Sequence, residues 1–154
     1  MNRKQTLTLL CALLILIGQA TLVSGQKKGT SKTPSLYERL GGSDKIGAIF
    51  DDVGPRMAAD PSLAKFFQGQ SPEALTSQRN MTVAFLCHET GGPCEYTGQP
   101  LKKAHGALHI NEAQWKAFLK HLGETLDHLM IGDKEKHDML ALVGRFKSEV
   151  VEKK

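Results

Sequence analysis

Apolar side chains recur at helical spacing along most of this chain, with polar side chains between them. The clearest stripe lies in residues 111–130, "NEAQWKAFLKHLGETLDHLM", and its apolar positions follow i, i+3, i+4, i+7: Trp115, Phe118, Leu119, Leu122, Leu126 and Leu129. Asn111 and Gln114 have the spacing of a capping box, which predicts that a helix begins at Asn111. No run of alternating β-branched residues is long enough for a strand. The pattern therefore predicts an all-α fold.

Two helices are predicted before this one, near the start of the folded region. Ser35 is expected to cap a short helix, "SLYERLGG", that Gly41-Gly42 stops. The next is expected to start at Ser43 and to carry one apolar face: Ile46, Ile49, Phe50 and Val53. Gly54-Pro55 interrupts it, because proline lacks a backbone donor and clashes with the carbonyl four residues back, at Asp51. This helix is expected to kink or divide there.

Further along the chain, serine and aspartate mark two more helix starts. Ser71 followed by Pro72 predicts a helix that runs to about Thr90. Asp133 is expected to cap the last helix, which has one apolar face: Met139, Leu142, Val143, Phe146 and Val150. The turn region before Ser71 is expected to pack three side chains inward: Leu63, Phe66 and Phe67.

The first residues have a different composition and resemble no part of a folded domain. "MNRK" is followed by the almost wholly apolar run Leu7–Ile17 and then by a polar, basic stretch. This layout predicts a signal peptide over residues 1–25 and export to the periplasm or the cell exterior. Residues 26–34 read as a linker and residues 35–152 as the domain. The alternative is an uncleaved membrane anchor formed by residues 7–23.

Composition and charge exclude several classes of protein. Apolar residues make up 40% of the chain and charged residues 23%, as in an ordinary globular protein. Its 154 residues suffice for one domain. Without residues 1–25, two of the 20 basic residues are lost, which leaves 18 against 16 acidic ones, or +2. This nearly even balance of basic and acidic residues predicts no nucleic-acid partner.

The cysteines and histidines allow several kinds of site. Cys87 and Cys94 form an even pair in a chain expected to be exported, which favours a disulfide, although two small buried thiols are the alternative. His105 and His109 have the spacing of a helical zinc pair, but Gly106 and the expected helix end make them a poor rigid pair. A zinc site is therefore not the favoured interpretation.

The stretch "GGPCEYTGQPLKKAH" isolates His105 on a short helix. Glycine and proline interrupt the chain before Pro100, which is predicted to start a helix of about one and a half turns, with Leu101 and His105 on one face. On the helix from Pro72, Gln78, Thr82 and Phe85 share a face. Polar groups there are costly if buried without partners, so this face either covers a pocket or bonds to nearby backbone. Taken alone, a histidine on an apolar helical face is more often a hydrogen-bonded core residue.

From Ser35 to about Val151 the chain resembles a group I truncated haemoglobin, a two-over-two helical globin. The resemblance is carried by "SLYERLGG", "ADPSLAKFF", "AFLCHETGGPCEYTG" and "PLKKAHGALHI". It implies that His105 is the proximal ligand of haem b iron and that Gln78 and Thr82 are distal hydrogen-bonding residues. It implies that the remaining haem contacts are Phe67, Phe85, Tyr96, Leu101, Ile110, Phe118 and Leu122.

The chain departs from this family in the helix that contains Gly54. Val53-Gly54 stands where these globins usually carry a Phe-Tyr pair, so the tyrosine hydroxyl that bonds oxygen is missing. The space it would fill is empty, filled by water or closed by a kink at Pro55. Hydrogen bonds to oxygen are then expected from Gln78, with Thr82 second.

The resemblance implies a protein that binds oxygen, nitric oxide or carbon monoxide and is primarily not an enzyme. Nitric-oxide dioxygenation would need an unidentified electron donor, since the sequence shows no reductase domain. One alternative is an exported haem electron-transfer protein, but His88 is a poor second axial ligand, being about 240° around the helix from Thr82. Another is a helical interaction domain without haem, stapled by zinc or a disulfide.

Overall fold

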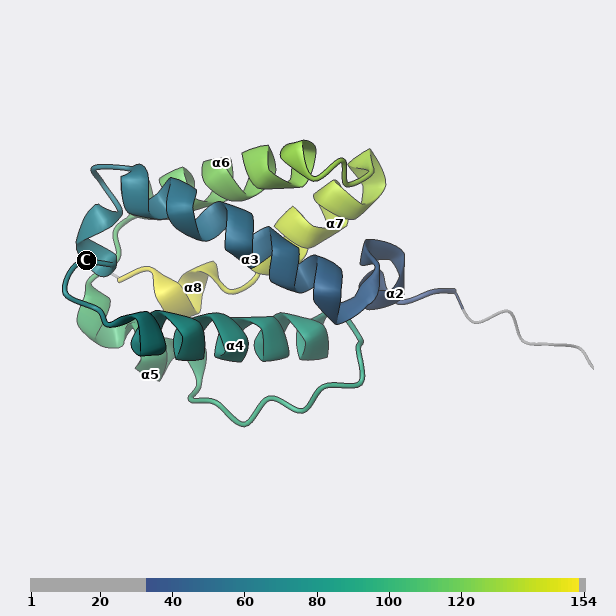
Figure 1. Cartoon of the computed structure of the whole chain (residues 1–154), viewed down its shortest axis with the longest axis horizontal. Helices are drawn as coiled ribbons and strands as arrows, with labels where there is room; N and C mark the ends of the chain where they lie inside the picture. Colours follow the sequence, from purple (N-terminus) through teal and green to yellow (C-terminus); the bar gives the residue numbers. More distant parts are fainter. Residues whose placement is uncertain (1–32, 153–154) are drawn as a thin grey trace, which may run out of the picture. The chain divides into compact units, whose positions relative to one another are not determined.

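The computed structural model describes residues 33–152, so the predicted leader and most of the predicted linker lie outside the described residues (Figure 1). The helices in this part are α2 (Leu36–Leu40), α3 (Gly42–Ala59), α4 (Pro72–Glu89), α5 (Leu101–His105), α6 (Glu112–His128), α7 (Asp133–Gly144) and α8 (Lys147–Val150). Single 3₁₀ turns occupy Ala64–Phe66 and Gly106–Leu108. Residues 33–152 contain no strand, which confirms the all-α prediction. None of the helices described is long and apolar enough to cross a membrane.

Helix α3 is the central element of the core. It packs against α4 on one side and α6 on another, and α6 packs against α7 (Figure 1). Leu40 of α2 joins a core whose other side chains come from these four helices: Ile46, Ile49, Val53, Leu86, Cys87, Trp115, Leu122, Leu126, Met139, Leu142 and Val143. Burying each large aliphatic side chain contributes about 1.5–3 kcal/mol, so this core holds the helices in place.

A half-buried carboxylate joins α3 to α6. Asp52 accepts hydrogen bonds from Arg56 Nε at 2.5 Å, from Thr125 Oγ1 at 2.7 Å and from His128 Nδ1 at 2.7 Å. The hydrogen bond from Arg56, followed by that from Thr125, holds the pKa of Asp52 well below its ordinary value. Because the charge is surrounded by donors, this polar group stabilises the joint between the two helices.

The predicted helix starts at Ser35, Ser71 and Asn111 are confirmed. The Ser35 side chain accepts from Glu38 N while Glu38 bonds back to Ser35 N, which completes a capping box. Ser71 accepts from Ala74 N, and Pro72 is the first residue of α4. Asn111 and Gln114 form the expected reciprocal pair. These caps depend on residues within one turn, which is why the local sequence predicts them.

The predicted start of α3 is wrong, and of the two outcomes expected at Pro55, a kink or a division, the division does not occur. The N-cap of α3 is Gly41, with a φ of 99°, and the helix already begins at Gly42. The hydroxyl of Ser43 instead lies 3.1 Å from that of Tyr37. The helix also does not divide at Pro55 but continues to Ala59. Gly54 allows this continuity, because the helical conformation before a proline is opposed by a clash that involves Cβ, which glycine lacks.

The predicted last helix is interrupted, and its cap differs. Gly132 occupies the N-cap position, and Asp133 is the first helical residue. α7 ends at Gly144, where the next two amides bond three residues back rather than four, Arg145 N to Leu142 O and Phe146 N to Val143 O. Glycine weakens a helix interior, so the tightened turn falls where the intrinsic preference is lowest.

Candidate functional site

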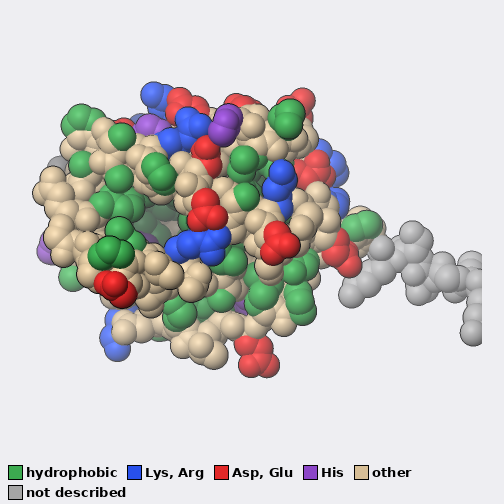
Figure 2. All heavy atoms as spheres, in the orientation of Figure 1, with side chains coloured by type: hydrophobic (Ala, Val, Ile, Leu, Met, Phe, Trp, Pro, Cys, Tyr) green, Lys and Arg blue, Asp and Glu red, His purple; other side chains and the backbone are tan. Residues whose placement is uncertain are grey.

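A cavity of about 990 Å³ lies between α3, α4, α5, α6 and the C-terminal segment. Figure 2 shows its opening as a hollow between α3 and α4. Its size is that of a small-molecule or cofactor site. The ten residues predicted as cofactor contacts all line this cavity: Phe67, Gln78, Thr82, Phe85, Tyr96, Leu101, His105, Ile110, Phe118 and Leu122.

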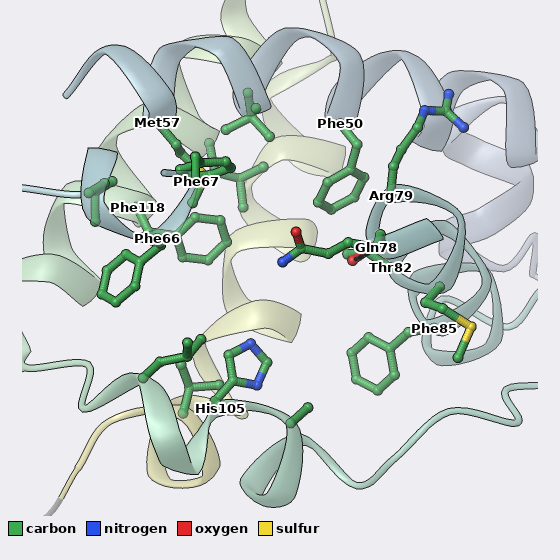
Figure 3. A pocket seen from close by; sticks show the side chains of 18 of the residues that line it. Phe50, Met57, Phe66, Phe67, Gln78, Arg79, Thr82, Phe85, His105 and Phe118 are labelled. Carbon is green, nitrogen blue, oxygen red and sulfur yellow. Dashed lines mark hydrogen bonds between the residues drawn. The ribbon is translucent and has the colours of Figure 1, made fainter. Parts of the chain in front are cut away.

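His105 projects into the cavity from α5 (Figure 3). Its Nδ1 lies 2.9 Å from the carbonyl oxygen of Leu101, one turn earlier. A carbonyl oxygen only accepts, so Nδ1 carries the hydrogen, and in the neutral ring Nε2 keeps its lone pair. A neutral imidazole held in this tautomer is the form that ligates a metal. This hydrogen bond to the Leu101 carbonyl orients the ring.

The loop before α5 is held at several points. A disulfide joins Cys87, at the end of α4, to Cys94, so the predicted bond is present. Gly92 N donates to the carbonyl of Cys87 at 2.8 Å, and Tyr96 Oη donates to Gln99 O at 2.7 Å. A Cβ at Gly98 would lie 2.4 Å from Tyr96 ring atoms, so the tyrosine packs here against a residue without a side chain. The loop thus fixes where α5 begins.

Aromatic side chains form one wall of the cavity between its proximal side, which carries His105, and its distal side, which carries Gln78 and Thr82. The rings of Phe85 and Tyr96 meet edge to face with centroids 5.1 Å apart, and Phe85 and Phe146 meet in the same way at 5.1 Å. Such pairs add about 0.5–1.5 kcal/mol beyond the area that they bury. Because the Tyr96 hydroxyl is bonded to Gln99 O, this residue presents its ring rather than its hydroxyl to the cavity.

The two polar residues of the distal side, Gln78 and Thr82, differ in their hydrogen bonding. Thr82 Oγ1 donates to the backbone oxygen of Gln78 at 2.8 Å, so its hydrogen is already used within α4. The side chain of Gln78 makes no hydrogen bond with any described residue and extends into the cavity between Phe50 and Phe85 (Figure 3). In this arrangement Gln78 supplies the free amide hydrogen of the distal side, and Thr82 offers an acceptor oxygen.

Gly54 leaves an open space in the α3 wall. A Cβ built at Gly54 would meet no atom within 4 Å, and Gly54 and Pro55 both line the cavity. Pro55 therefore does not close the space that a larger side chain at position 54 would fill. Of the three expectations for this space, closure by a kink is wrong.

The cavity wall is nearly neutral. Among the described residues that line it, the acidic and basic side chains besides His105 are Asp51 and Arg79, and these pair with each other across α3 and α4. Arg79 Nε and Nη2 donate to the two carboxylate oxygens of Asp51 at 2.5 and 2.7 Å. The hydrogen bond from Arg79 lowers the pKa of Asp51. Figure 3 shows Arg79 directed away from the centre of the cavity, toward α3.

Sequence reasoning did not assign many of the apolar lining residues to the site. They include Phe50, Met57, Leu75, Met81, Leu108 and Phe146. Helical spacing marks Phe50 and Phe146 as inward-facing but does not separate cavity from core. Leu75, Met81 and Leu108 are 37–40% exposed yet line the cavity. An apolar group seated there would cover them, so the lining suits a large, mostly apolar cofactor with one nitrogen ligand.

Comparison with known proteins agrees with this chemistry. The family model described as "Bacterial-like globin" matches residues 35–152. The Group 1 truncated hemoglobin LI410 of Chlamydomonas moewusii is 33% identical over 125 residues, which cover 79% of this chain and 71% of that protein. The Group 1 truncated hemoglobin GlbN of Nostoc commune is 37% identical over 92 residues, covering 60% of this chain and 75% of the relative.

Solved structures show the same fold. The truncated hemoglobin of Tetrahymena pyriformis superposes with a TM-score of 0.71 at 22% identity, covering 78% of this chain and all of that one. Chlamydomonas reinhardtii THB1 superposes with a TM-score of 0.65 at 27% identity, covering 78% and 98% of the two chains. The chain belongs to the bacterial-like globin family, within the group 1 truncated hemoglobins.

Proposed function

We propose that this globin holds haem b through His105 and reversibly binds oxygen, or another diatomic gas, on the Gln78 side of the cavity. The observation that carries the proposal is the His105 ring, whose Nδ1 is fixed by Leu101 O and whose Nε2 faces the cavity. When bound, haem supplies an iron centre that can take oxygen, nitric oxide or carbon monoxide as a ligand.

The surrounding residues fit this cofactor in three ways. His105 offers one neutral nitrogen, as the proximal ligand of globins does. Apolar side chains cover the rest of the wall, and Leu75, Met81 and Leu108 would lose their exposure against a flat apolar group. The ring of Phe85 packs against those of Tyr96 and Phe146, so this part of the wall is stiff. Together these residues would orient the cofactor and exclude water.

Gln78 gives the distal side its polarity. Its side-chain amide has no partner among the described residues and can donate to a ligand that carries partial negative charge. A neutral hydrogen bond of this kind contributes about 0.5–1.5 kcal/mol, and more toward a charged acceptor. Thr82 contributes less, because its hydrogen already bonds the Gln78 carbonyl. Retention of a polar gas therefore depends on Gln78.

The test is reconstitution of the purified chain with haem, followed by absorption spectra. His105→Ala is expected to abolish the ferrous five-coordinate spectrum, because it removes the nitrogen that retains haem. His88→Ala and His109→Ala are matched controls, since neither residue lines the large cavity, and both are expected to keep the spectrum. An unchanged spectrum in His105→Ala would overturn the assignment.

Gas binding is favoured over electron transfer by the distal side. A second histidine ligand would suit an electron-transfer protein, but no histidine other than His105 lines the large cavity in residues 33–152. His88 is exposed, and its Nδ1 lies 3.2 Å from Cys94 O. Turnover of nitric oxide would require an electron donor from outside the chain, so we propose binding rather than catalysis as the primary role.

Export is the proposed destination of the chain. It is supported by the apolar run Leu7–Ile17 behind a basic start and by the disulfide between Cys87 and Cys94, a bond that persists in oxidising compartments. The mass of the protein from its native compartment is expected to correspond to a start near Gln26. Retention of residues 1–25 would instead support an anchor formed by residues 7–23.

A further inference from the structure

The cavity face of α3 has a gap between two large side chains. Phe50, Gly54 and Met57 stand at i, i+4 and i+7, so they share one face of the helix, and all three line the cavity. Phe50 and Met57 project from α3 into the cavity in Figure 3. Gly54 between them contributes no side chain, and a Cβ placed there would meet nothing within 4 Å.

We infer that this gap, the Gly54 subsite bounded by Phe50, Gly54, Met57 and Gln78, admits uncharged ligands larger than a diatomic gas. The ligand class is a compact apolar body that carries one donor atom for iron, as in an alkyl isocyanide or an imidazole. The inference rests on the proposed haem site, because iron would hold the donor atom. The body of the ligand would occupy the Gly54 subsite.

The continuity of α3 keeps this space open. The helix runs from Gly42 to Ala59 without dividing at Pro55, so the turns that carry Phe50 and Met57 stay in register and flank the gap. Ile49 and Val53 are buried in the same turns and fix the helix against its neighbours, and Val53 also lines the cavity. The space is therefore a feature of the wall and does not require α3 to move.

The chemistry of the wall selects uncharged ligands. Asp51 and Arg79 neutralise each other at the edge of the cavity, so the part of the chain that the structure describes places no unpaired charge beside the gap to hold an ion. Gln78 can donate to or accept from one polar atom of the ligand, while the rings of Phe50 and Phe85 suit an apolar body. A charged ligand would lose its hydration here without compensation.

Alkyl isocyanides of increasing bulk test the inference by equilibrium binding to the haem-loaded protein. Because a Cβ before proline opposes the helical conformation, the comparison uses Pro55→Ala as the reference and Gly54→Phe/Pro55→Ala as the filled variant. We expect the affinity ratio of tert-butyl to methyl isocyanide to fall at least tenfold in the filled variant, while carbon monoxide affinity changes less than threefold. An isocyanide ratio that changes less than threefold would overturn the inference.

Two further arms keep the result decisive. Gly54→Ala in the same Pro55→Ala background fills the space less and replaces the phenylalanine variant if that one does not fold. It should also lower the ratio of tert-butyl to methyl isocyanide affinity, by a smaller factor. Gly144→Ala is the matched control, because a Cβ there also meets nothing within 4 Å but Gly144 does not line the cavity. Its isocyanide ratio is expected to equal that of the wild type, and a fall like that of the filled variant would overturn the inference.

Xenon provides a readout that does not involve iron. Apolar cavities bind xenon, so crystals under xenon pressure are expected to show an atom in contact with Gly54 in the Pro55→Ala reference and none there in the filled variant. Xenon at Gly54 in both, or in neither, would count against the subsite. If the wild type retains no haem, the proposed function fails, whereas xenon still decides whether the subsite exists.

Discussion

The two halves of α4 are built differently, although they form one continuous helix. In the C-terminal half, Leu86 and Cys87 are buried, and the cap residue Thr90 is 4% exposed. The Thr90 hydroxyl donates to Leu86 O at 2.6 Å, and the Thr90 carbonyl accepts from Tyr37 N at 2.9 Å. The disulfide ties Cys87 to the following loop. In the N-terminal half, residues 72–82, every side chain is exposed or half-buried.

This difference separates structural from functional polar groups. Thr90 is buried and uses its hydroxyl and backbone within the protein, so it stabilises the helix end. Gln78 lies on the same helix, lines the cavity and has no side-chain partner among the described residues. A polar side chain with no partner on a cavity wall is free to recognise a ligand. We call residues 72–82 the free half of α4 and the remainder, which Thr90 and the disulfide hold, the anchored half. The anchored half fixes the position at which the free half meets the cavity.

Removing the anchor is expected to have the largest effect on stability. The disulfide closes a short loop, since its cysteines are seven positions apart. Reduction should lower the free energy of unfolding by about 2.5 kcal/mol, because the unfolded chain regains the freedom that the loop removes. Urea unfolding with and without a dithiol measures this difference. Cys87→Ala/Cys94→Ala is the control and should not respond to the dithiol; equal midpoints for oxidised and reduced wild type would contradict the prediction.

Changing the free half should alter ligand retention rather than stability. Gln78→Leu removes the amide that can donate to oxygen, and the loss of about 1.4 kcal/mol corresponds to a tenfold faster oxygen dissociation. Carbon monoxide, which is less polar when bound, should be affected less. Stopped-flow measurements on wild type and variant test this, with urea unfolding as the control for an intact fold. Equal oxygen dissociation rates would show that the distal side is not built around Gln78.

The smallest effect is expected at the ion pair that links the free half to α3. The side chains of Asp51 and Arg79 are 59% and 37% exposed, so their pair should contribute less than about 1 kcal/mol. Arg79 lowers the pKa of Asp51, so this contribution is present above about pH 4, the ordinary range of an aspartate, and is lost as the pH falls through the lowered pKa. Arg79→Gln should remove that part of the acid dependence. Thermal unfolding at pH 7 and pH 3 measures it as the difference between the two melting temperatures, which should be smaller in the variant than in the wild type. An equal difference in both proteins would exclude a role for the pair.

The local sequence predicts those parts of the fold that depend on neighbouring residues. Ser35, Ser71 and Asn111 cap helices because each capping partner lies three residues away. Ser43 fails as a cap because Gly41, in a left-handed conformation, has already turned the chain into α3. The continuity at Pro55 departs from the usual effect of a proline within a helix, since Gly54 lacks the Cβ that would oppose the helical conformation before it.

The site shows the same division between local and distant information. His105 and Leu101 are one helical turn apart, so their hydrogen bond follows from spacing. The contact of Phe85 with Phe146 joins residues about sixty positions apart and depends on how the last segment folds back. The open space at Gly54 is a property of the whole wall, and the sequence alone leaves it undecided between open and closed.

The Gly54-Pro55 pair constrains the order in which substitutions can accumulate. A side chain added at Gly54 while Pro55 remains places a Cβ against the proline ring and strains the helix. Replacing Pro55 first restores the amide that can bond the Asp51 carbonyl, after which position 54 can accept a side chain without that clash. A bulky residue at position 54 is thus accessible through one sequence of mutational steps and penalised in the reverse one. The proline acts as a barrier that keeps the wall open against single substitutions.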